Sequence, residues 1–155
     1  TRRGTPQIQD PGINSLSKLN CITACIEADR AGADEGIMLD IHGNVATCNS
    51  TNFFIVKNGE VWTSTGEFCL PGVTRKAVID ICQSHYIPIF QKDFSIMDVH
   101  SSNEAFVTGT FAGIIPAIEI DGQAISGGKR GGMTFRLQKY YSEKLAKLYP
   151  EKVIK

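Results

Sequence analysis

Neither an excess of charge nor a long apolar run is present in this sequence of 155 residues. Its 16 Lys and Arg residues balance 16 Asp and Glu residues, to a formal net charge of +0. Nucleic-acid-binding domains carry a basic surplus or stripe, so the balance argues against a nucleic-acid partner. No apolar run approaches the roughly 20 residues of a membrane-spanning helix, and the first residues lack the pattern of a signal peptide. We therefore expect a cytoplasmic protein with no membrane or nucleic-acid partner.

A metal-binding pattern is also missing. Cys21 and Cys25 lie four residues apart, yet no second pair of Cys or His residues completes a zinc site. The three histidines are scattered and match neither a metal site nor a catalytic triad. We expect no metal, and we expect the five cysteines to be reduced and to pack as small apolar side chains.

What the sequence does contain is the composition of one folded domain. Hydrophobic residues are 42% of the chain and charged residues 21%, as in ordinary globular domains, and the length fits a single domain. Apolar residues at spacings of three and four predict helices over residues 15–30, 73–82 and 133–148. Short apolar runs between them predict strands, and the pair Asn58 and Gly59 predicts a hairpin turn. We expect one α/β domain.

Three local features refine this prediction. A strand over residues 87–89 contains Pro88, which lacks a backbone donor, so we expect it at a sheet edge. Ser95 is placed to cap a short helical turn. The first predicted helix carries a stripe along one face, formed by Leu16, Leu19, Ile22, Thr23 and Ile26.

Two glycine-containing loops have the features of anion sites. The first places Gly72, Val73 and Thr74 at the start of a helix, where unpaired N–H groups and the helix dipole favour negative charge. The alternative is that Thr74 acts as an ordinary helix cap. The second loop, residues 109–113, follows a strand and offers N–H groups and a hydroxyl, or is simply a turn. Neither is a P-loop, and together they suit a phosphorylated cofactor.

Three segments in coherent order carry a family resemblance: residues 40–59, 70–75 and 104–110. They resemble, in turn, the central block, the phosphate-binding turn, and the strand and anion-binding loop of the class IV (fold type IV) pyridoxal-phosphate aminotransferases. This family includes the branched-chain and D-amino-acid transaminases and aminodeoxychorismate lyase. The resemblance runs from about residue 6 to residue 149.

The resemblance implies a fold and a place in a larger protein. Residues 1–155 resemble the large C-terminal domain of the D-amino-acid aminotransferase-like fold, an α/β (α+β) domain with flanking helices. Its sheet is mixed and largely antiparallel, or a pseudo-barrel. We expect the family's N-terminal domain, with an arginine used on the cofactor phosphate, to be absent from this sequence, which leaves the site incomplete. The family dimerises, so a homodimer is expected.

The resemblance also assigns residues to the cofactor, pyridoxal 5′-phosphate (PLP). The N–H groups of Phe111 and Ala112 would face the substrate carboxylate, and Asn52 would stand in the pocket wall. Backbone donors suit these roles because they bind anions without introducing mobile charge. The phosphate would be held at two turns, by Gly72, Val73, Thr74, Gly109 and Thr110.

Two positions depart from the family pattern. Asn14 takes the place of the lysine that forms the Schiff base, and an amide cannot form an imine. Thr47 replaces the glutamate that pairs with the pyridine nitrogen and keeps the ring an effective electron sink. A threonine offers that nitrogen only a neutral hydrogen bond.

Lys18 is a candidate to compensate for the missing lysine. It occupies a position where the family commonly has a tyrosine, four residues after Asn14 and one helical turn along the same face. We hypothesise that Lys18 is a relocated Schiff-base lysine whose pKa is lowered by partial burial. The alternative is that it donates to the cofactor's 3-hydroxyl or to solvent.

The function implied by the resemblance is PLP-dependent transfer of an amino group between a branched-chain type amino acid and a 2-oxo acid such as 2-oxoglutarate. The leading alternative is a pseudoenzyme that keeps the phosphate cradle but has lost turnover, because the changes at Asn14 and Thr47 are what such a loss would leave. A third possibility is a PLP-dependent lyase of the aminodeoxychorismate lyase type, or an enzyme that uses PLP without a protein Schiff base.

Overall fold

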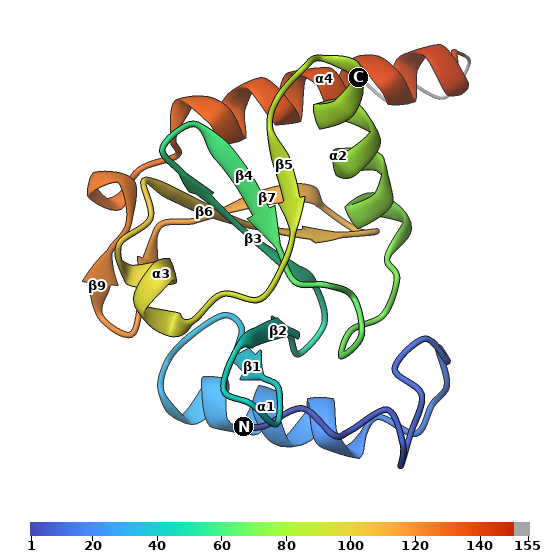
Figure 1. Cartoon of the computed structure of the whole chain (residues 1–155), viewed down its shortest axis with the longest axis vertical. Coiled ribbons are helices and arrows are strands. Elements are labelled where there is room, and N and C mark those ends of the chain that lie inside the picture. The colour runs from blue at the N-terminus through green and yellow to red at the C-terminus, as the bar shows by residue number, and fades with distance from the viewer. Residues whose placement is uncertain (151–155) are drawn as a thin grey trace.

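A computed structural model describes residues 1–150 (Figure 1). The helices are α1 (Leu19–Arg30), α2 (Val73–Ser84), α3 (Ile96–His100) and α4 (Gly132–Leu148), with a 3-10 turn at Ser126–Gly128. The strands are β1 (Ile37–Leu39), β2 (Val45–Cys48), β3 (Asn52–Lys57), β4 (Glu60–Thr63), β5 (Ile89–Gln91), β6 (Glu104–Gly109), β7 (Gly113–Ala117), β8 (Glu119–Ile120) and β9 (Gln123–Ala124).

The centre of the fold is a five-stranded sheet in the order β5-β4-β3-β6-β7. Only the β4–β5 pair is parallel, so the predicted mixed and largely antiparallel sheet is confirmed. The predicted hairpin joins β3 to β4, and both turn residues have positive φ, 52° at Asn58 and 81° at Gly59. The predicted edge position of β5 is confirmed, but the strand begins at Ile89 rather than at residue 87, so Pro88 precedes it.

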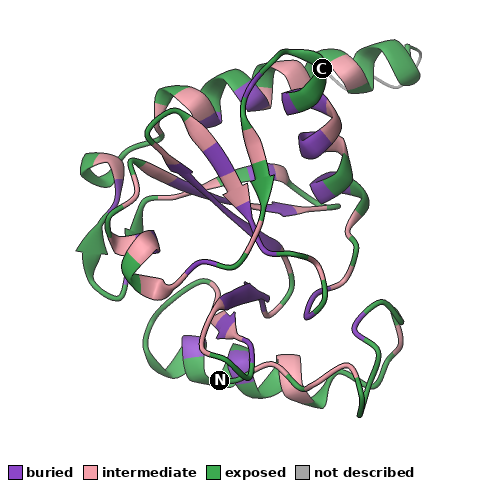
Figure 2. Cartoon of the chain, in the orientation of Figure 1, coloured by how far each residue is buried: buried purple, intermediate pink, exposed green. Residues whose placement is uncertain are grey.

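Two apolar clusters fill the space on either side of this sheet. The first lies under α2 and α4, where the rings of Phe54 and Phe106 stack with centroids 4.9 Å apart against Val78 and Leu137. The second joins β2, β3 and β6 to α3 and includes Ile55. Figure 2 shows the buried residues gathered on the central strands and along α2. Burial of this many large side chains is the main term that stabilises the fold.

Helix α1 lies beside the small β1–β2 sheet, at the opposite end of the molecule from α4 (Figure 1). It begins at Leu19 rather than at residue 15, so the predicted start is wrong by four residues. The turns between Ser15 and Lys18 are closed by local hydrogen bonds instead, including one from the Ser17 amide to the Ser15 hydroxyl. Such short polar side chains compete with the helix for backbone donors.

The face of α1 that packs inward is made of small residues. Ala24 and Ala28 are buried, and a Cβ on Gly36 would lie 3.0 Å from the Ala24 carbonyl oxygen, which shows how closely the backbones approach. The predicted apolar stripe therefore lies on the exposed side, with Leu19 77% and Ile26 46% exposed.

Candidate functional site

A cleft of about 550 Å³ opens between the N-terminal segment, the start of α1 and the turn that joins β2 to β3. Four of the predicted site residues line it: Asn14, Lys18, Thr47 and Asn52. They come from parts of the chain up to 38 positions apart in sequence, the separation between Asn14 and Asn52. The fold thus brings the predicted lysine position, its candidate replacement and the altered glutamate position to one cavity.

Thr47 is buried, and its hydroxyl is already committed to the protein. Its Oγ1 donates to the Thr51 carbonyl oxygen at 2.7 Å, which closes the turn between β2 and β3. Because a hydroxyl has one proton, the Thr47 oxygen is left only as an acceptor toward the cleft.

The turn before α2 is joined to the cleft by Asn52. The Asn52 side-chain amide donates to the Leu70 carbonyl oxygen at 3.0 Å, and both residues line the cleft. A Cβ on Gly72 would collide with the Asn52 side-chain oxygen, so glycine is required for this approach. Asn52 therefore fixes the position of the first turn of α2 relative to the cleft.

In the described part of the chain, residues 1–150, no side-chain cap is present at the N-terminus of α2. Its N-cap residue is Gly72, without a side-chain hydrogen bond, so the interpretation of Thr74 as an ordinary helix cap is wrong. Thr74 instead lies buried inside the first turn, while Val73 is 73% exposed. The first backbone N–H groups of α2 therefore have no side-chain cap at the N-cap position and lie at the positive end of the helix dipole.

The second predicted loop is the tight β6–β7 turn. Gly109 and Gly113 form the last residue pair before the turn. Phe111 at the tip of the turn is fully exposed, and Thr110 and Ala112 beside it are also exposed. Neither this turn nor Gly72, Val73 and Thr74 is part of the cleft lining. The turn adjoins the cleft wall, however, because a Cβ on Gly109 would lie 3.2 Å from the Thr51 methyl group.

Lys18 differs from its predicted setting. Its side chain is exposed, so the expected partial burial is wrong, and it is the N-cap residue of α1. Asn14 precedes the helix in an exposed irregular segment, so the two residues do not share a helical face as predicted. Both still line the same cleft.

An arginine–cysteine contact in the cleft is not foreseen by the sequence. Arg3 Nη1 lies 2.8 Å from Cys21 Sγ, and its Nε donates to the Phe68 carbonyl oxygen at 3.2 Å. Both Arg3 and Cys21 line the cleft. No sequence spacing signals a contact across 18 residues, and the sequence indicates Cys21 only as a small apolar side chain.

Within residues 1–150 no set of three His, Cys, Asp or Glu side chains is arranged to hold a metal ion. Over the same residues, no helix has both the length and the apolar character needed to cross a bilayer.

Residues 1–120 match the amino-transferase class IV family. The chain is 38% identical over 143 residues to branched-chain-amino-acid aminotransferase-like protein 2 of Arabidopsis thaliana, which covers 92% of this chain and 26% of that protein. It is 39% identical over 123 residues to the branched-chain-amino-acid aminotransferase of Pseudomonas aeruginosa, which covers 79% of this chain and 40% of that one.

The fold superposes on the crystal structure of the T.th. branched-chain amino acid aminotransferase with pyridoxamine 5′-phosphate. The TM-score is 0.90 at 29% identity, over 97% of this chain and 50% of that chain. The chain thus spans half or less of the length of these relatives. Because the family match, the sequence relatives and the fold agree, the chain belongs to the class IV aminotransferases, as a homologue of the branched-chain type.

Proposed function

We propose that residues 1–155 form the PLP-binding domain of a transaminase that moves an amino group between a branched-chain type amino acid and a 2-oxo acid. The observation that carries this proposal is the uncapped first turn of α2, which Asn52 ties to the wall of the cleft. This donor set fits a phosphorylated cofactor, because backbone N–H groups at a helix N-terminus stabilise a phosphate. A relative with the same fold is solved with pyridoxamine 5′-phosphate, which supports the assignment.

The phosphate end of the cofactor would be held by two turns of this chain. The N–H groups of Val73 and Thr74 begin α2 and are without a side-chain cap. The Thr110 hydroxyl lies in the β6–β7 turn and supplies a neutral donor. In this arrangement the N–H groups of Phe111 and Ala112, exposed at the same turn, face the substrate carboxylate.

The ring end would lie against Thr47. When bound, PLP supplies an electron sink for negative charge at the amino acid's Cα. The Thr47 oxygen can accept a hydrogen bond from a protonated ring nitrogen, because its own proton is donated to Thr51. It contributes no negative charge, so it stabilises that protonated form less than a carboxylate would.

Lys18 supplies the amine that would take the proton from the substrate's Cα and return it. It lines the cleft beside Asn14, which has no titratable group and cannot take this role. Because Lys18 is exposed at the start of α1, its side chain has several rotatable bonds to reach the substrate. We assign it as the general base and acid between the substrate's Cα and the cofactor.

PLP binding is tested by titrating the 155-residue chain with PLP and following cofactor absorbance. Thr74→Val should weaken PLP binding by at least about tenfold, since it removes a hydroxyl donor to a charged phosphate. Pyridoxal, which has no phosphate, should bind both proteins equally weakly. Equal PLP affinity of Thr74→Val and the unchanged chain would show that the phosphate is not held at α2.

The role of Lys18 is tested by borohydride reduction in the presence of PLP, followed by mass spectrometry. We expect a pyridoxyl adduct on Lys18, and loss of both adduct and amino transfer in Lys18→Ala. Lys129→Ala, in an exposed glycine-rich loop, is the matched control and should behave like the unchanged chain. Normal turnover in Lys18→Ala would remove Lys18 from the mechanism.

A second candidate function is PLP binding without turnover. One observation favours it: Lys18 is exposed, and it does not share a helix face with Asn14. The test uses the full-length parent protein: PLP binding with no adduct on any lysine and no amino transfer would establish this alternative.

A further inference from the structure

Thr108 on β6 is one of the most deeply buried polar residues of the fold. Its side chain is only 2% exposed, and its Oγ1 has no hydrogen-bond partner among residues 1–150. A buried hydroxyl that leaves its hydrogen bond unmade costs about 1–3 kcal/mol, and such groups are rare in folded proteins. The position therefore calls for a partner beyond the residues that the structure describes.

The direction of the Thr108 side chain follows from strand register. Thr108 lies directly opposite Asn52 on the neighbouring antiparallel strand, and opposite residues project from the same face of a sheet. Asn52 reaches the first turn of α2, since its amide donates to Leu70 and its oxygen occupies the space beside Gly72. The Thr108 side chain therefore projects from the sheet face that carries the Asn52 side chain and this turn.

Two independent features thus meet at one place: an uncapped helix N-terminus and an unpartnered buried hydroxyl. We propose that Thr108 donates a hydrogen bond to the phosphate group held at the first turn of α2. The inference rests on the proposed function and deepens it, by naming a ligand-binding residue to which the family resemblance assigns no role. Thr110, whose hydroxyl the proposed function places at the phosphate, follows β6 in the next turn, two positions after Thr108.

The proposal predicts opposite effects with and without ligand. Thr108→Val has nearly the same shape but removes the unpaired hydroxyl, so the ligand-free protein should be equally stable or more stable. The same change removes a donor to a charged group, so PLP affinity should fall by at least about tenfold. If the Thr108 hydroxyl only stabilised the fold, Thr108→Val would lower the stability of the ligand-free protein and leave PLP affinity unchanged.

The experiment compares the unchanged chain with Thr108→Val and Thr108→Ser. Thermal unfolding is measured without ligand, and binding of PLP, pyridoxal and inorganic phosphate is measured by absorbance and by phosphorus NMR line width. We expect Thr108→Ser to retain phosphate-dependent binding, and pyridoxal binding to be unaffected by either change. Thr63→Val is the matched control, because Thr63 is buried in the same sheet but already donates to Phe53 at 2.9 Å. It should lower stability and leave PLP affinity unchanged.

The outcomes separate this inference from the proposed function. If the unchanged chain and Thr108→Val bind PLP with equal affinity, or if Thr108→Val destabilises the ligand-free protein as Thr63→Val does, the role of Thr108 is overturned and PLP binding stands. If PLP does not bind but inorganic phosphate binds in a Thr108-dependent manner, the anion site stands and the proposed function is wrong. If neither binds, both are overturned.

Discussion

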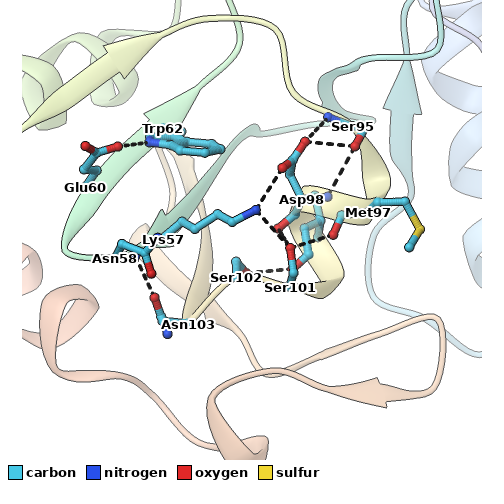
Figure 3. Close-up of polar contacts among 11 residues, drawn as sticks. Lys57, Asn58, Glu60, Trp62, Ser95, Met97, Asp98, Ser101, Ser102 and Asn103 are labelled. Carbon is cyan, nitrogen blue, oxygen red and sulfur yellow. Dashed lines mark hydrogen bonds and ion pairs between the residues drawn. The ribbon is translucent and has the colours of Figure 1, made fainter.

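Lys57 and Asp98 form an ion pair that joins the end of β3 to the short helix α3. Lys57 Nζ lies 2.9 Å from Asp98 Oδ1, and the other carboxylate oxygen accepts from the amide and hydroxyl of Ser95 (Figure 3). Ser95 in turn accepts from the Asp98 amide, so the predicted cap at Ser95 is confirmed as a full capping box. The pair therefore anchors α3 against the sheet that supports the site.

This ion pair should make stability depend on acid pH. The hydrogen bond from Lys57, followed by those from Ser95, lowers the pKa of Asp98 from 3.8 to about 2. The Asp98 carboxylate takes up its proton at a higher pH in the unfolded chain than in the folded chain. The stabilising contribution of the ion pair to the free energy of unfolding is therefore fully present above about pH 4 and is lost as pH falls toward 2. The Lys57 and Asp98 side chains are 22% and 33% exposed, so we expect solvent screening to reduce it to about 1 kcal/mol.

The measurement is urea unfolding between pH 2 and pH 5 on the chain and on Asp98→Asn. The free energy of unfolding of the unchanged chain should fall more steeply below pH 4 than that of the variant. Asp80→Asn is the control, because Asp80 pairs with the exposed Lys76 and with Lys144 of α4 and has no contact with α3 in these ion pairs. Parallel pH profiles for the chain and Asp98→Asn would contradict the assignment.

Glu104 should be important for the final helix. Its carboxylate accepts from the amides of Met133 and Thr134 and from the Thr134 hydroxyl, each at 2.8 Å, and so caps α4 from β6. Glu104→Ala should lower the free energy of unfolding by about 2 kcal/mol, because three donors lose a charged acceptor. Chemical denaturation tests this, with Glu143→Ala on the exposed side of α4 as the control. Equal losses in the two variants would show that the cap contributes little.

The β3–β4 hairpin turn and the Ser95 cap were predictable because each depends on residues close together in sequence. Asn58 and Gly59 adopt positive φ for local steric reasons, and the Ser95 cap needs only Asp98 three residues later. The burial of α1 was less predictable. The pattern of large apolar residues indicated one face, but contact with Gly36 selected the face with Ala24. That choice is made by tertiary packing, which periodicity does not encode.

For the candidate site, the sequence motifs predict individual residues but not the contacts between them. The resemblance supplied Asn52 and Gly72 separately, but the contact between them, which joins the α2 turn to the cleft, is a property of the fold. Thr108 could have been found from the sequence, since it lies two positions before Thr110 at the end of a strand. That its hydroxyl lacks a hydrogen-bond partner could not be found from the sequence, because the partners of a buried hydroxyl come from all the elements packed around it.

Gly72→Ala should weaken PLP binding without unfolding the protein. The added Cβ would collide with the Asn52 side-chain oxygen, which would displace the amide or move the first turn of α2. We expect PLP affinity to fall by at least about tenfold, because misplaced N–H donors lose their charge-assisted hydrogen bonds. Gly132→Ala, where a new Cβ meets nothing within 4 Å, is the control and should leave PLP binding unchanged. Unchanged PLP binding in Gly72→Ala would show that the turn position is not critical.

Asn14→Lys tests whether the cleft still has the geometry for a lysine at the family position. Asn14 is exposed and lines the cleft, so the longer side chain has room and its amine reaches the same cavity as Lys18. With PLP and borohydride, we expect the variant to form its main adduct at position 14, and to do so also in the Lys18→Ala background. Amino transfer should rise by at least about tenfold over the unchanged chain, because an amine at the family position can exchange the proton that an amide cannot. An adduct confined to Lys18 in Asn14→Lys would show that the segment before α1 holds position 14 away from the cofactor. The register that equates Asn14 with the family lysine would then be wrong.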